Sequence, residues 1–167
     1  KKGMPLAVID IPELKDELTE KLAKVEQAKS AEGQAIAAIT QSEAMVKQRL
    51  AEVKQTQSHK LEKKALLELQ ETKLKRVQGL FDQGSIGEEN LDEAKYAVKA
   101  AQSALDSVSA DEKAALANVN AAKAGEEKAK ADKASATANL KVATAVAKRA
   151  ETMVGFAVVK APFDGII

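Results

Sequence analysis

The residues that could take part in catalysis or metal binding are few, and their spacing favours neither. His59 is the only histidine among 167 residues, and there is no cysteine, so a metal site built from such ligands is not expected. The carboxylates form no isolated pair within an apolar segment, as general acid and base catalysis would need. No serine lies in a nucleophile motif, and no glycine-rich phosphate loop is present. We therefore expect no enzyme activity, no bound metal and no cofactor.

The charged residues are balanced in number and mixed along the chain. There are 26 lysines and arginines against 25 aspartates and glutamates, a net charge of +1. Because there is no basic block with interleaved aromatic residues, the sequence does not indicate nucleic-acid binding. Opposite charges at helical spacing, such as Glu127 and Lys130, indicate solvated helix faces instead. No run of 18 apolar residues occurs, so we expect no membrane-spanning segment here.

Small and apolar residues recur every seven positions, which predicts long helices that pack against one another. Residues 13–161 contain no proline to interrupt them. One column consists almost entirely of alanine: Ala94, Ala101, Val108, Ala115, Ala122, Ala129, Ala136, Ala143 and Ala150. An earlier column has larger side chains: Ile11, Leu18, Val25, Ile39, Val46, Val53, Leu67, Leu74 and Phe81. With one tyrosine, three phenylalanines and no tryptophan, this composition is typical of a coiled coil rather than a globular core.

Turn residues divide the columns into two helices. The first helix is predicted over residues 12–81, because Pro12 suits a first helical turn and Gly84 suits a left-handed helix end. A turn over residues 82–87 follows, and the second helix is predicted over residues 88–154.

Two residues compete to cap the second helix. Ser85 and Glu88 have the spacing of a capping box, whereas Gly87 directly precedes the helix. Carboxylates in the first turns of this helix favour its positive end. At the other end, Gly155 is the expected stop.

A strand is predicted before the first helix and another after the second. Residues 5–11 have a β-branched centre, and the apolar run 156–161 has strand character. Because a hairpin returns the chain to its start, both strands should lie at the same end. We therefore expect a mainly α fold: a long antiparallel two-helix coiled-coil hairpin, residues 12–154, with short β stubs of one split domain at its base, residues 1–11 and 155–167.

The register of the hairpin follows if facing core residues have numbers that sum to 172. The expected layers pair Phe81 with Leu91, Leu74 with Val98, Leu67 with Leu105, Val53 with Val119, Leu50 with Ala122, Ile36 with Ala136, Leu22 with Ala150 and Leu18 with Val154. The same rule places Lys60 opposite Glu112. Our hypothesis is that this polar pair fixes the register, as polar core residues do in other coiled coils.

The two ends carry a more specific pattern. Residues 2–10, Lys-Gly-Met-Pro-Leu-Ala-Val-Ile-Asp, with Pro-Glu-Leu at 12–14, resemble the end of a first lipoyl half-motif. Residues 159–167, Val-Lys-Ala-Pro-Phe-Asp-Gly-Ile-Ile, resemble the start of the second. A lipoyl-like domain split by a helical hairpin resembles the periplasmic adaptor, or membrane fusion, proteins of the HlyD-like family. These proteins belong to tripartite efflux pumps and type I secretion systems.

The resemblance implies a coupling role without chemistry. Such a protein is a periplasmic subunit that forms rings, commonly hexamers, and links an inner-membrane transporter of ABC, major-facilitator or resistance-nodulation type to a TolC-like outer-membrane duct. Since the chain begins at Lys1 without a methionine, we expect a fragment whose inner-membrane anchor lies elsewhere.

The resemblance also assigns residues to the hairpin tip, which docks on the duct. The family pattern is an arginine, a leucine four residues later and a serine seven further on. Arg76 and Leu80 match it, Gly87 stands at the serine position, and Ser85 lies two residues earlier.

Simpler interpretations remain open for the tip and for the whole chain. Arg76 is also explained as a solubilising charge, Leu80 as packing beside Phe81, and Ser85 and Gly87 as turn residues. The whole chain is also explained as a coiled-coil spacer or tether without an export role, or as a segment that coats a membrane surface or is disordered alone. The two β stubs disfavour the spacer, and the narrow small-residue stripe disfavours the membrane-surface helix.

Overall fold

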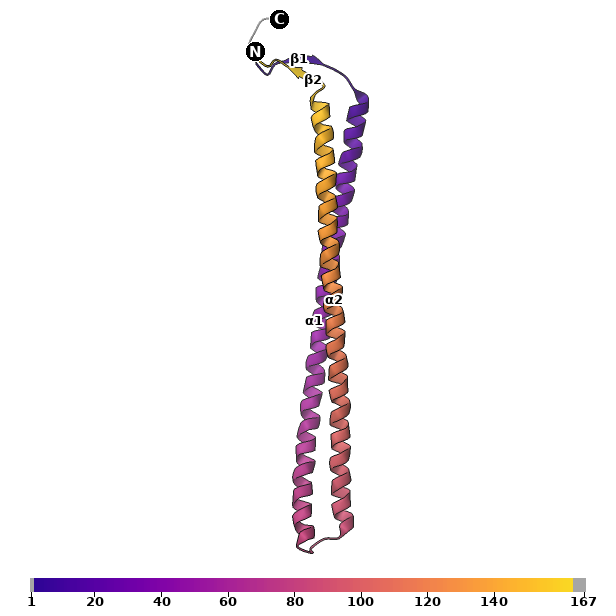
Figure 1. The fold of residues 1–167 in the computed structure, drawn as a ribbon, viewed down its shortest axis with the longest axis vertical. Helices are drawn as coiled ribbons and strands as arrows, with labels where there is room; N and C mark the ends of the chain where they lie inside the picture. The colour runs from indigo at the N-terminus through magenta and orange to yellow at the C-terminus, as the bar shows by residue number, and fades with distance from the viewer. Residues whose placement is uncertain (1, 164–167) are drawn as a thin grey trace. The chain divides into compact units, whose positions relative to one another are not determined.

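A computed structural model describes residues 2–163 and contains two helices and two strands (Figure 1). In chain order these are β1 (Pro5–Val8), α1 (Pro12–Asp82), α2 (Glu88–Gly155) and β2 (Val158–Lys160). The expected fold class is confirmed, because two long helices pack together and the strands form an antiparallel two-stranded sheet. The part of the second predicted stub at 164–167 lies outside the described residues.

The chain divides into two compact units, and both helices pass from one into the other. The terminal unit comprises Lys1–Gln41 and Glu127–Ile167, and the turn unit comprises Ser42–Glu126. Each unit contains a stretch of α1 and an antiparallel stretch of α2.

The terminal unit contains the β ribbon, which is shorter than predicted at both strands. Its register pairs Pro5 with Lys160 and Val8 with Val158. Strand β1 ends before residues 10–11, since Pro12 already begins α1. Strand β2 starts late because Phe156 still donates its backbone N–H to the α2 carbonyl of Thr152, at 3.2 Å.

The seam between the helices follows a spacing of alternately three and four residues. In α1 the row of large apolar residues is accompanied by a second half-buried row three positions later. Many members of this second row are polar: Lys21, Ser42, Arg49, Thr56, Lys63 and Gln70. The facing stripe of α2 is rich in alanine, of which Ala101, Ala147 and Ala150 are buried. Among the described residues no large side chain is fully buried, so many thin layers hold the helices together.

Three of the expected core layers are wrong. Leu22, Ile36 and Leu50 are 54%, 47% and 47% exposed, so they do not fill the seam opposite alanines. The half-buried residue is in each case the preceding one: Lys21, Ala35 and Arg49. The heptad spacing explains this result. Seam residues alternate at intervals of three and four, so the residue three positions after each large seam residue faces the partner helix. The residue that follows it lies at the edge of the seam.

The turn ends α1 in a Schellman motif. Gly84 adopts a left-handed conformation with φ of 71°. The backbone N–H of Gly84 donates to the Phe81 carbonyl at 2.8 Å, and that of Ser85 donates to the Leu80 carbonyl at 2.9 Å. These two bonds satisfy carbonyls that the end of a helix otherwise leaves unpaired. Gly87 precedes the first helical residue of α2 and therefore takes the cap position.

Replacing Gly84 by alanine should destabilise the turn unit, because a left-handed conformation costs an L-residue roughly 1–2 kcal/mol. Gly125 provides the matched control: it lies inside α2 with open space around an added Cβ. Gly125→Ala should therefore stabilise the helix by about 1 kcal/mol. Urea unfolding followed by circular dichroism measures both changes. Shifts of the same sign for the two variants would contradict the assigned turn conformation.

Candidate docking interface at the hairpin turn

The turn presents all four residues predicted for docking on the surface of the turn unit. Arg76, Leu80, Ser85 and Gly87 are exposed. Arg76 and Leu80 lie four residues apart within α1, so their side chains share one helix face. Ser85 and Gly87 lie in the connection between the helices, where the first supplies a backbone hydrogen bond and the second a helix cap.

Apolar side chains at the turn are shielded from solvent. Leu91 of α2 is buried, and Phe81 and Ile86 are half-buried. Leu80 is 40% exposed, so the place inside the seam belongs to its neighbour Phe81. The turn therefore rests on its own small core, and Leu80 remains accessible to a partner.

The charges around the turn are separated between the two helices. Residues 72–81 of α1 contain three basic residues and no acidic one, whereas α2 begins with Glu88 and Glu89. The carboxylates stabilise the positive end of α2. The positive charge of Arg76 has no such structural role, because the helix-dipole effect is confined to the last turn and α1 has no basic residue there.

Lys60 and Glu112 meet across the two helices of the turn unit. The Lys60 Nζ donates a hydrogen bond to the Glu112 Oε2 at 2.8 Å, and the Glu112 side chain is only 16% exposed. This bond, followed by one from the Gln57 side chain, lowers the pKa of Glu112 below its ordinary value of 4.5. The structure thus brings the two predicted residues together. That they determine the register stays a prediction.

A second polar contact across the helices lies in the terminal unit and was not predicted. The Thr137 hydroxyl donates to the Glu32 Oε1 at 2.6 Å. Glu32 occupies the seven-residue column between Val25 and Ile39, where an apolar residue is otherwise expected. That interruption is the sequence signal that could have identified it, just as the interruption at Lys60 identified the other pair.

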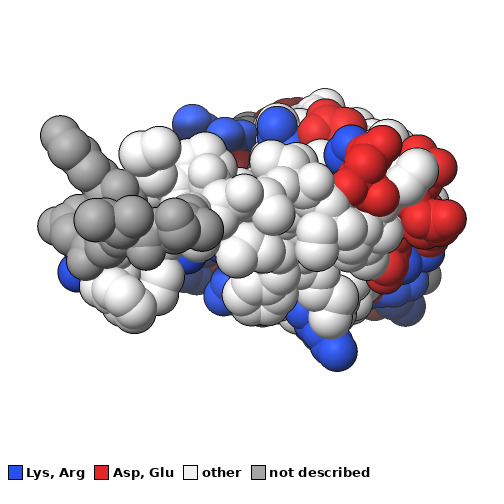
Figure 2. Space-filling view, turned by 90° about the horizontal axis from the view of Figure 1, so that it is seen from above, with Lys and Arg blue, Asp and Glu red and all other residues white. Residues whose placement is uncertain are grey.

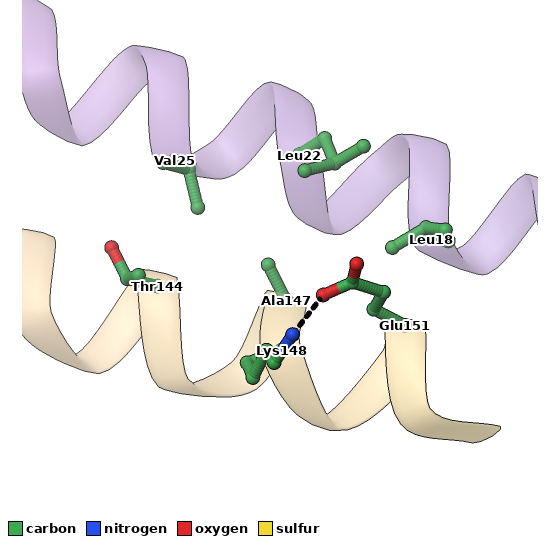
Figure 3. A pocket seen from close by; sticks show the side chains of 7 residues that line it. All are labelled: Leu18, Leu22, Val25, Thr144, Ala147, Lys148 and Glu151. Atoms are coloured by element: carbon green, nitrogen blue, oxygen red, sulfur yellow. Dashed lines mark hydrogen bonds and ion pairs between the residues drawn. The ribbon is translucent and has the colours of Figure 1, made fainter. Parts of the chain in front are cut away.

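The terminal unit also has a shallow hollow of about 260 Å³ between the helices (Figure 3). Leu18 and Val25 of α1 lie opposite Ala147 of α2, whose small side chain leaves the space open, and the exposed Leu22 lines the edge of the hollow. At its rim the Lys148 Nζ donates to the Glu151 Oε2 at 2.7 Å. The hollow is apolar, and its only charged groups neutralise each other, so it offers no arrangement for acid–base catalysis.

Within residues 2–163, no group of three or more histidines, aspartates or glutamates is arranged to hold a metal ion. In the same part of the chain, neither helix has a stretch both long and apolar enough to cross a membrane.

The lowered pKa of Glu112 predicts a pH dependence of stability. A carboxyl group whose pKa is lowered by folding contributes stability above its unfolded pKa, and this contribution is lost as the pH falls through the folded value. Replacing Glu112 by glutamine should therefore reduce the urea midpoint at pH 7, with a smaller difference from the wild type at pH 3. A Glu62→Gln variant, on the exposed surface of α1, is the control. An equal Glu112→Gln effect at both pH values would contradict a stabilising ion pair.

Comparison with known proteins identifies a similar fold. No known family profile matches the chain, and no curated protein sequence matches it. A solved structure of the periplasmic adaptor protein EmrA has the same fold, with a TM-score of 0.58 and 19% sequence identity. The match covers 99% of this chain and 57% of that one, so this chain spans somewhat over half the length of EmrA. The fold of this chain is therefore similar to part of the EmrA structure.

Proposed function

We propose that this chain is the hairpin region of a periplasmic adaptor that links an inner-membrane transporter to an outer-membrane exit duct for efflux or secretion. The observation that carries this proposal is the pairing of β1 with β2, which joins the two ends of the chain beside the open end of the hairpin. The fold similarity to the adaptor EmrA supports the same role. The protein acts by binding and assembly, and we assign it no catalytic step.

The exposed surface of the β ribbon supports a split domain at its base. Leu6 and Val8 are exposed along β1, as are Met4 just before β1 and Phe156 before β2. Figure 2 views this end of the molecule, where uncharged surface adjoins a group of carboxylates. Because an isolated two-stranded ribbon is at best marginally stable in water, we infer that further strands of a lipoyl-like domain cover it. A simple spacer would not need such a ribbon.

The turn is the part of the chain that contacts the duct in this proposal. Arg76 and Leu80 face the helices of a TolC-like duct, while Ser85 and Gly87 hold the geometry of the turn. The exposure of all four residues and the uncompensated charge of Arg76 support this assignment. Chemically, a cation beside a leucine suits a helix that carries a carboxylate next to apolar residues.

The remaining parts of the assembly follow from the same proposal. The full protein is periplasmic, is held at the inner membrane by a segment outside the described residues, and forms a ring, most simply a hexamer. Its inner-membrane partner is a transporter of ABC, major-facilitator or resistance-nodulation type. The thin seam of each hairpin suits such an assembly, because neighbouring copies would add lateral support.

The double variant Arg76→Glu with Leu80→Ala should weaken duct binding by roughly tenfold or more, since hot-spot residues dominate protein interfaces. Binding of the full-length protein to a purified TolC-like duct, measured by biolayer interferometry, tests this, together with export in cells. Lys75→Glu is the control, because Lys75 is exposed near the turn but lies on a different face of α1. Full duct binding and full export by the double variant would exclude the docking role of the turn.

A further inference from the structure

The two docking residues belong to a longer exposed row on α1. Leu66, Leu69, Lys73, Arg76 and Leu80 follow one another at spacings of three, four, three and four residues. This spacing places all five on one helix face. Each of the three leucines is at least 40% exposed, and both cations are exposed. We call these five residues the docking stripe; it spans 15 residues of α1, with about 21 Å between its first and last residue.

The docking stripe is separate from the seam that binds α1 to α2. The seam residues of the same segment are Leu67, Gln70, Leu74 and Val77, all buried or half-buried. A helix that packs against one partner needs only one apolar face. The leucines of the docking stripe therefore form a second apolar row, which the contacts within the hairpin leave uncovered.

The cations of the docking stripe lack partners within the chain. Among residues 2–163, neither Lys73 nor Arg76 forms an ion pair, whereas other lysines of the turn unit do. Examples are Lys60 with Glu112 and Lys95 with Asp92, at 2.8 and 2.9 Å. Two unpaired positive charges between exposed leucines are complementary to an amphipathic helix that carries carboxylates.

A second face of α1 in the same part of the helix carries balanced charges. Leu61, Lys64, Glu68, Glu71 and Lys75 have the same spacing, with two cations and two carboxylates. Lys64 and Glu68 pair with each other at 4.0 Å. This second row is neutral and has one leucine, so it fits a solvated surface and serves as a matched control face.

We propose that the docking stripe is a lateral binding surface for a carboxylate-bearing helix of the outer-membrane duct. The duct helix then packs along the side of α1 as far as Leu66, rather than touching the turn alone. This inference rests on the proposed function, because the stripe is continuous with Arg76 and Leu80. It adds Leu66, Leu69 and Lys73 to the residues that bind the duct.

The test compares substitutions on the two faces in the full-length protein. The probe is a purified TolC-like duct of the same organism in detergent micelles. Lys73→Glu and Leu69→Ala should each weaken binding by about tenfold, as expected for interface hot spots. Lys75→Glu and Leu61→Ala, on the control face, should change it less than about twofold. Circular dichroism checks that all four variants retain their helices, and sedimentation measures their self-association.

The outcomes separate this inference from the function on which it rests. If the Lys73 and Leu69 variants bind like the controls while Arg76→Glu with Leu80→Ala weakens binding, docking is confined to the turn and the stripe proposal is overturned. If none of these variants weakens binding, both proposals fail. If Lys73→Glu disrupts self-association but not duct binding, the stripe contacts a second copy, which also overturns the proposal.

A photo-crosslinking residue provides an independent readout in cells. With p-benzoylphenylalanine at position 69, an adduct with the duct protein, identified by mass spectrometry, supports the proposal. The same residue at position 61 should form no such adduct. An adduct at 69 with another copy of this protein, or duct adducts from both positions alike, would contradict a specific lateral docking surface.

Discussion

The narrow seam between α1 and α2 is the constraint on which the rest of the structure depends. Only every third or fourth residue of each helix faces the other helix. Many of these positions hold alanine or a polar side chain. Each layer therefore buries little apolar area, and stability accumulates over many layers. The same geometry sends large residues such as Leu22 and Leu50 to the rim. The apolar surface of these side chains, which a thicker core would bury, thus remains available for contacts with other molecules.

We propose that polar contacts across the seam fix the register of the two helices. A series of similar alanines would tolerate a shift of one helix along the other, since each alanine would meet an equivalent neighbour. Lys60 with Glu112 and Thr137 with Glu32 would lose their hydrogen bonds in a shifted register. Leaving a part-buried carboxylate without its partner is costly, so these pairs disfavour alternatives even where their net contribution is small. One pair lies in each unit of the chain.

The main features of the fold could be predicted from the sequence because each has a local physical cause. The heptad columns predict the helices, and Gly84 predicts the turn since only glycine adopts its backbone conformation without strain. The predicted layers at Leu22, Ile36 and Leu50 are wrong because a large apolar side chain does not by itself place a residue in the seam. The heptad spacing places the preceding residue there instead. Strand lengths depend on competition with helix ends, which composition does not reveal. The docking roles of Arg76, Leu80, Ser85 and Gly87 remain predictions, because they depend on the surface of another protein.

These features combine into one account of function. The turn is held by a small core, carries its own caps and presents exposed side chains, while the paired strands join the other ends of the helices. In the proposed function, the base domain and the turn are the two contact regions, and the hairpin connects them. In the proposal above, the unpaired cations Lys73 and Arg76 recognise carboxylates of the partner.

The most direct test of this account is the mobility of the turn when a duct is added. Because the chain has no cysteine, a single nitroxide label at Ser85→Cys reports on the turn by electron paramagnetic resonance. If the turn docks as proposed, a TolC-like duct immobilises this label but leaves a label at the exposed Lys47 of α1 unchanged. An unchanged spectrum at Ser85→Cys with saturating duct would contradict docking by the turn.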